Sequence, residues 1–222
     1  MSEEGIRLAK RVAALQACSR RAAEELIASG AVKVAGEVVT DPARRVPEDL
    51  PVQVSAGPVS GAMTVLLHKP AGVAATEALQ QAWPALALGP VPPAGLKEWL
   101  PLPRQASGLS VWSDERPVVR RLMDRERPLE TEWLLTLPMA AAGAVIPPLQ
   151  AGGVRASLGH ERDGVGQWRL VDKGDPGSEL ADFLDAGQFS DAWTLRRQRV
   201  GRQGLSPLSV GQARLRLDFE KF

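Results

Sequence analysis

The sequence predicts an α+β protein in two parts, a small module of helices and hairpins followed by a larger domain built mainly of strands. Two amphipathic helical patterns lie within residues 6–27, and short alternating β patterns follow them up to residue 54. After a glycine-rich linker, strand patterns outnumber helical ones and are spaced as in hairpins. This order favours a mixed or antiparallel sheet with flanking helices. We therefore expect a module at 1–56, a linker at 57–62 and a second domain at 63–222.

The composition is that of a soluble globular protein, with 44% hydrophobic and 24% charged residues in 222. Because the net charge is only +1, a nucleic-acid partner would have to be recognised by local clusters of cations. Cys18 is the one cysteine and His68 and His160 are the only histidines, so we expect no disulfide, metal or cofactor. No apolar run approaches about 18 residues. We expect a cytoplasmic monomer without a membrane partner.

Two helices are predicted in the module, the first at residues 6–16 and the second after Ser19, whose hydroxyl suits an N-cap. Their apolar stripes share the helical spacing and consist of Leu8, Val12 and Leu15 in the first helix and Ala23, Leu26 and Ile27 in the second. Gly30 ends the second helix. Arg20 and Arg21 occupy the first turn of that helix, where the helix dipole disfavours cations. Their position favours a functional role over plain solvation.

The rest of the module is a small sheet. Residues 32–34 and 37–39 alternate around the turn Ala35-Gly36, which predicts a hairpin, and residues 52–54 form a further strand. From residue 7 to 54 the chain closely resembles the alpha-L, or S4-type, RNA-binding module, through CSRRAAEELI at 18–27 and GAVKVAGEVV at 30–39. The resemblance implies contact with the phosphates of structured RNA by five cations, Arg7, Lys10, Arg20, Arg21 and Lys33.

In the second domain, strands are predicted at 64–67, 109–112, 132–137, 168–171, 192–200 and 213–219, and helices at 117–127 and around 180–184. Residues 77–99 are rich in alanine and proline, with Trp83 and Trp99 as expected packing anchors, and residues 152–166 form a glycine-punctuated connection. Strand alternation would place Arg197 and Arg199 on one face of the sheet and Arg196 on the other. Arg197 and Arg199 are candidates for a secondary RNA contact.

This second domain resembles the catalytic domain of the RsuA-type bacterial pseudouridine synthases, which carry the same N-terminal module. The similarity rests on the Lys69-Pro70-Ala71-Gly72 segment, on Ser107-Gly108-Leu109, and on the late run from Leu195 to Gly201. The resemblance implies an isomerase fold acting on uridine in RNA. It also implies positions for catalytic residues that can be counted from these motifs.

The residues that carry the family's chemistry are missing at those positions. Counting back from Ser107 places Pro103 at the catalytic aspartate and Pro101 at the motif's arginine. Trp133 stands in place of the active-site tyrosine, and Ala181 falls in the late basic helix. Proline cannot supply a carboxylate and tryptophan has no hydroxyl for general-base work. We therefore expect no catalytic residue in the cleft.

The main hypothesis is a non-catalytic RNA-binding protein of the synthase family that binds structured, ribosomal RNA. A first alternative is an active synthase with a relocated carboxylate, for which Glu98 and Asp114 are nearest to the loop in sequence. A second alternative is an interaction protein of ribosome assembly or stress response.

Overall fold

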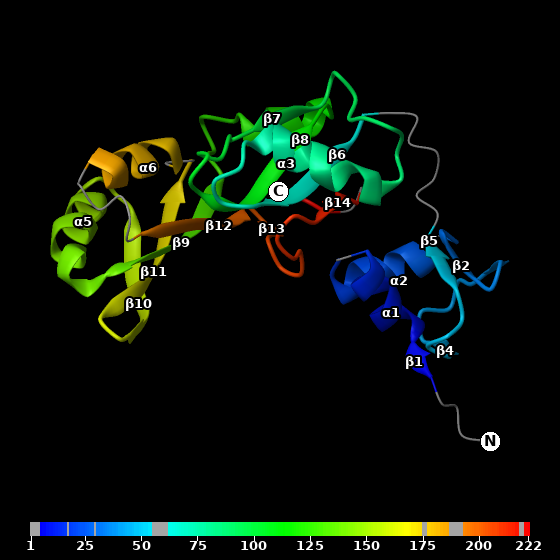
Figure 1. The fold of residues 1–222 in the computed structure, drawn as a ribbon. Coiled ribbons are helices and arrows are strands. Elements are labelled where there is room, and N and C mark those ends of the chain that lie inside the picture. The colour runs from blue at the N-terminus through cyan, green and yellow to red at the C-terminus, as the bar shows by residue number, and fades with distance from the viewer. Residues whose placement is uncertain are drawn as a thin grey trace. The chain divides into compact units, whose positions relative to one another are not determined.

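The computed structural model describes residues 5–16, 18–28, 30–54, 62–174, 177–186, 193–217 and 220–222. It divides the chain into two compact units, Met1–Gly61 with Ser206–Leu208 and Ala62–Leu205 with Ser209–Phe222 (Figure 1). Apart from residue 62, the expected linker lies outside the described residues. The predicted α+β class is confirmed, with helices and small sheets in the first unit and a large mixed sheet in the second. No helix among the described residues is long and apolar enough to cross a bilayer.

The first unit consists of β1 (Ile6–Arg7), α1 (Leu8–Leu15), α2 (Arg20–Ala28), β2 (Val32–Val34), β3 (Glu37–Val38), β4 (Arg45–Val46) and β5 (Val52–Val54). Two small sheets form, one of β1 with β4 and one in the order β3-β2-β5. The predicted hairpin is confirmed, and its turn residues Ala35 and Gly36 have φ of 49° and 89°. Two positive φ values match the primed turn that suits the twist of paired strands.

The first helix differs from the prediction at both ends. Ile6 and Arg7 are extended and pair with β4, so α1 begins only at Leu8. Leu8 and Val12 are fully buried as expected, whereas Leu15 is 56% exposed because the helix ends at that residue. The long-range pairing with β4 has replaced the first helical turn that local periodicity favoured.

The second unit begins with β6 (Thr64–Lys69), α3 (Ala75–Ala82), the 3-10 helix η1 (Trp83–Leu86), β7 (Lys97–Trp99), β8 (Ser107–Ser113) and α4 (Arg116–Leu122). It continues with β9 (Glu130–Pro138), α5 (Met139–Ala151), β10 (Arg155–Arg162), β11 (Val165–Lys173), α6 (Gly177–Ala186), β12 (Thr194–Val200), β13 (Gln203–Gly204) and β14 (Ala213–Leu215). The sheet order is β10-β11-β9-β12-β8-β6-β14, with β7 paired to β8 and β13 to β12.

The sheet is mixed because β12 runs parallel to β8, whereas the other pairs in the described part of the sheet are antiparallel. In this parallel pair Gly108 of β8 is opposite Arg197 of β12 and has φ of +113°. A Cβ at this position would lie 2.3 Å from the carbonyl oxygen of Arg197. Glycine in the Ser107-Gly108-Leu109 segment is therefore required by this strand contact.

Helices cover one face of the sheet at each of its ends. Figure 1 shows α5 and α6 beside β9 and β11, and the buried cluster there joins Trp133, Leu135 and Leu137 of β9 to Val145 of α5 and Leu184 of α6. At the other end, α3 and η1 pack on β6, and Trp83 is buried as predicted.

Helix α5 and strand β10 are among the elements that the sequence did not predict. Helix α5 is apolar almost all round and contains Pro147 and Pro148, so it offers no amphipathic period to detect. The expected glycine-punctuated connection at 152–166 contains the edge strand β10, whose residues are nearly all exposed and therefore lack an apolar alternation.

Candidate functional site

The first unit contains a basic hollow, a cavity of about 410 Å³ lined by Gly5, Ile6, Arg7, Lys10, Ala13, Arg20 and Arg45. Four of these lining residues are cationic, and none of them is acidic. The hollow therefore gathers positive charge in a protein whose net charge is only +1. A concave cationic surface of this kind is suited to phosphate groups.

Arg7 and Arg45 lie side by side at the edge of the hollow. They are direct cross-strand partners in the β1–β4 pair, and Arg45 Nη1 also donates to the Gly5 carbonyl at 2.8 Å. Like charges directly opposite each other in a strand pair are destabilising unless an anion lies between them. Sequence reasoning missed Arg45 because it lies outside the runs 18–27 and 30–39 that carry the resemblance, and it reaches Arg7 only through this long-range pairing.

The structure brings three of the five predicted RNA-contact residues together. Arg7, Lys10 and Arg20 line the hollow, whereas Arg21 and Lys33 are exposed and are not among its lining residues. Arg20 and Arg21 each donate through Nε to the glutamate one turn later, Glu24 and Glu25, at 3.2 Å. Such exposed pairs stabilise a helix by about 0.3–0.5 kcal/mol, which partly offsets their unfavourable position in the first turn.

Arg11 has a structural role beside the hollow. Its guanidinium donates to the carbonyls of Pro47, Glu48 and Leu50 at 2.6, 2.7 and 2.5 Å. These contacts attach the segment before β5 to α1 and support the neighbouring strand β4. Arg11 therefore stabilises the structure beside the hollow and is not one of its lining residues.

The second unit contains a buried polar cluster, which we define as Lys69, Glu98, Ser110, Trp133 and Arg197. Lys69 is fully buried, and its Nζ donates to the carbonyls of Pro70, Arg104 and Ala106 at 2.8, 3.0 and 2.7 Å. Burial lowers the pKa of Lys69 to about 8, while the nearby carboxylate of Glu98 acts against that shift.

Arg197 fills the space between the Ser107-Gly108 segment and Trp133. Its Nε donates to the Leu109 carbonyl and its Nη1 to the Leu100 carbonyl, both at 2.7 Å. The guanidinium lies 5.3 Å from the centre of the Trp133 ring, and that ring is itself 1% exposed. Arg197 thus occupies a face of the indole with a cation–π contact.

Glu98 is the carboxylate of the cluster. It accepts hydrogen bonds from Ser110 Oγ at 2.7 Å and from the Leu102 amide at 3.3 Å. Burial raises the pKa of Glu98, and these hydrogen bonds together with the charges of Arg197 and Lys69 act against the rise. Asp114, the other acid near the loop, instead accepts the Met63 amide at 2.5 Å and holds the start of β6.

The four positions at which the sequence resemblance predicts lost catalytic residues have different surroundings. Pro101 is exposed and Pro103 half-buried, in a loop whose neighbours Leu102 and Ala106 are buried. Trp133 lies in the polar cluster, and Ala181 is buried on α6. Within the described residues, no group of three His, Cys, Asp or Glu side chains could hold a metal ion.

The prediction that Arg197 and Arg199 share a face of β12 is wrong. Arg197 is opposite Trp133 and Arg199 is opposite its neighbour Glu132, because a β-bulge between them adds one residue to β12. The side chains therefore point to opposite faces, and Arg199 lies with Arg196, which is opposite Leu134. Full burial of Arg197 is also incompatible with the predicted phosphate contact by that residue.

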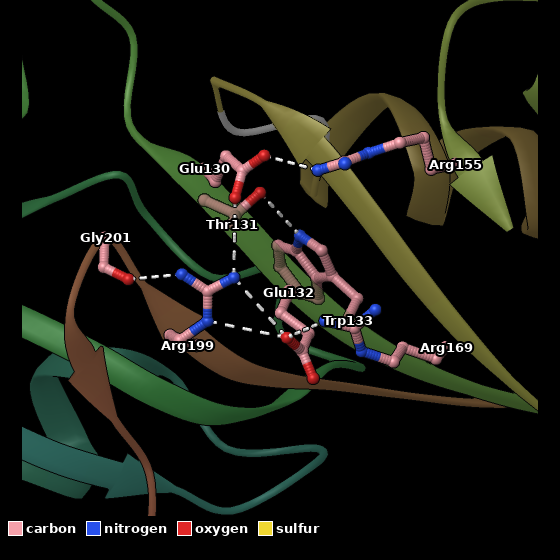
Figure 2. Close-up of polar contacts among 8 residues, drawn as sticks. All are labelled: Glu130, Thr131, Glu132, Trp133, Arg155, Arg169, Arg199 and Gly201. Carbon is pink, nitrogen blue, oxygen red and sulfur yellow. Dashed lines mark hydrogen bonds and ion pairs between the residues drawn. The ribbon is translucent and has the colours of Figure 1, made fainter. Parts of the chain in front are cut away.

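Arg199 belongs to a network of charges on the solvent-facing side of the sheet. Figure 2 shows the carboxylates of Glu130 and Glu132 among the guanidiniums of Arg155, Arg169 and Arg199. Arg199 Nε lies 3.4 Å from Glu132, and Arg169 Nη2 lies 2.7 Å from the same carboxylate. The hydrogen bond from Arg169 lowers the pKa of Glu132, so this carboxylate stays ionised.

Comparison with known proteins locates one family within the chain. Residues 6–52 match the model of the S4 domain, and no protein of curated function matches the sequence. A crystal structure of a pseudouridylate synthase is similar with a TM-score of 0.48 and 20% identity, over 96% of both chains. The archaeal box H/ACA Nop10–Cbf5 complex has a TM-score of 0.44 and 16% identity, over 66% of this chain and 49% of that chain. The chain carries an S4 domain in its first unit.

Proposed function

We propose that this chain is an RNA-binding protein that holds the phosphate backbone of structured RNA, ribosomal RNA in particular, in the basic hollow of its S4 domain. The observation that carries the proposal is the Arg7–Arg45 pair, in which two cations are cross-strand partners and line a cavity with no acidic lining residue. A phosphate between the two guanidiniums would relieve their repulsion and accept hydrogen bonds from both.

The proposal is tested by the salt dependence of RNA binding. Each phosphate contact contributes roughly one unit to the slope of log affinity against log salt concentration. Arg7→Gln combined with Arg45→Gln should therefore lower that slope by about two units. Arg116→Gln with Arg120→Gln, on the exposed face of α4, removes the same charge and should leave the slope unchanged.

An unchanged slope in the hollow variant would show that the hollow does not bind the backbone. A third variant, Arg21→Gln with Lys33→Gln, determines whether contact extends to the two predicted residues outside the hollow. Fluorescence anisotropy of a labelled RNA hairpin at several salt concentrations measures all three variants on the intact chain.

We further propose that the second unit retains a synthase-like architecture without isomerising uridine. Pro103 supplies no carboxylate where the sequence resemblance requires one, and Trp133 supplies no phenolic hydroxyl. The packing of Arg197 on Trp133 supports this view, because a guanidinium at 5.3 Å occupies a ring face that a base would need for stacking.

One observation favours the alternative of an active synthase. Glu98 is a half-buried acid of raised pKa in the same cluster as Arg197 and Lys69, as a relocated proton-handling group would be. Release of tritium from RNA with labelled uridine bases decides between the two, because isomerisation frees the hydrogen from the carbon that forms the new glycosidic bond. We expect no release by the wild-type protein. Release that disappears in Glu98→Gln would establish the alternative.

A further inference from the structure

The sheet has one face that no part of the proposed RNA site uses. Along β9, the buried residues Trp133, Leu135 and Leu137 point toward α5 and α6, so Glu130 and Glu132 point to the opposite, solvent-facing side. The register of neighbouring strands places six cations on that side within the described strands. We call this the basic sheet face and define it by Arg155, Arg162, Arg169, Lys173, Arg196 and Arg199.

The cations of the basic sheet face form cross-strand rows. In one row, Arg169 of β11 and Arg196 of β12 are both opposite Leu134 of β9, and this row of three residues contains no acid. In the next row, Arg199 is opposite Glu132, and Glu132 is opposite Val171, which pairs in turn with Arg155. Neighbouring strands lie about 4.8 Å apart, and the two arginines are two strand spacings apart in the first row and three in the second.

The acids that pair with this face, Glu130 and Glu132 on β9 and Asp163 beside Arg162, do not neutralise its six cations. Glu132 is shared by Arg169 and Arg199, and Glu130 by Arg155 and Arg199. Three arginines held by two acids keep an excess of positive charge and have restricted side-chain freedom, which reduces the entropy lost on binding. The side chains of Arg155 and Arg169 are still 69% and 52% exposed, so they have N–H donors available to a ligand.

We propose that the basic sheet face is a second contact surface for the phosphate backbone of RNA, carried by the second unit. Arginine forks match phosphate oxygens in bidentate geometry, and six cations gather on this one face of the sheet. A protein partner is disfavoured, because within the described strands no register position of this face holds Trp, Tyr or Phe, the side chains that dominate protein interfaces. This inference depends on the proposed function in one respect, the identification of the bound polyanion as RNA.

The test removes three cations of this face whose loss still leaves Glu130 and Glu132 each paired with an arginine. Arg169→Gln, Lys173→Gln and Arg196→Gln are combined in the full chain, while Arg155 and Arg199 remain on Glu130 and Glu132. The control combines Arg116→Gln, Arg120→Gln and Arg125→Gln, three exposed residues in and after α4. Anisotropy of a fluorescein-labelled RNA hairpin over a salt series should give a slope lower by about two to three units for the first set. The control should keep the wild-type slope.

An unchanged slope in the first set, or an equal fall in the control, would overturn the proposal. Phenylglyoxal modification of the wild-type protein gives a second measurement that needs no variant. Bound RNA should protect Arg169 and Arg196 and leave Arg120 reactive, and equal reactivity with and without RNA would also overturn it. This test and the test of the hollow have separate outcomes. If only Arg7→Gln with Arg45→Gln weakens binding, the basic sheet face is refuted and the S4 site is supported. If only the triple variant of the basic sheet face weakens binding, the S4 site is refuted and the basic sheet face is supported.

Discussion

Replacement of Arg197 by leucine should cost the second unit much of its stability. Arg197 is fully buried, donates two hydrogen bonds at 2.7 Å to backbone carbonyls and packs on Trp133. Hydrogen bonds from a charged group contribute about 1.5–3 kcal/mol each, and a buried cation–π contact contributes up to about 2 kcal/mol. Leucine recovers part of this through apolar burial, so we expect the free energy of unfolding to fall by about 3–5 kcal/mol.

The matched control is Arg199→Leu, two residues along the same strand but on the other face because of the bulge. Arg199 is 30% exposed and is held by shared ion pairs with Glu130 and Glu132. Exposed pairs of this kind contribute at most about 1 kcal/mol. Both variants replace arginine by leucine. The difference between their losses in the free energy of unfolding therefore measures the effect of burying the arginine.

Urea denaturation followed by tryptophan fluorescence is the suitable assay. All six tryptophans of the chain lie beyond residue 62, so the signal reports the second unit alone. A loss below about 1 kcal/mol in Arg197→Leu would refute the role assigned to its hydrogen bonds. An equal loss in Arg199→Leu would refute the placement of the bulge.

Three further predictions concern other parts of the chain. Because the pKa of Lys69 is about 8 when folded and 10.5 ordinarily, the unfolded chain binds more protons between these values, so stability should rise with pH in that window; Lys69→Met should abolish this rise in urea titrations across pH 7 to 11. Limited proteolysis should cut first within residues 56–61 and leave a fragment of about 160 residues, whereas cleavage confined to the region of Gly152 would place the boundary elsewhere. Pro103→Asp alone should restore no tritium release, since Pro101, Trp133 and Ala181 remain unsuited and catalytic groups fail as a unit; release by this variant would show that the rest of the site is competent.

The sequence alone determined the local elements and their order. Ser19, the apolar stripe at Ala23 and Ile27, and the Ala35-Gly36 turn depend on neighbours within a few residues, and they define an S4 module before any folding is known. The predicted strand at 132–137 likewise lies within β9, where Trp133, Leu135 and Leu137 are buried. These signals are readable because capping, turn geometry and periodic burial are short-range effects.

Only the tertiary structure decided which charges meet. Arg45 joins Arg7 through a strand pair that also shortens the first helix, and no local pattern encodes that pairing. The bulge in β12 separates Arg197 from Arg199, burying one and placing the other beside Glu132. A single inserted residue moves every later side chain of the strand to the opposite face of the sheet. The register of distant strands is fixed by packing over the whole sheet. Strand alternation in the sequence therefore identified the arginines but could not assign their faces.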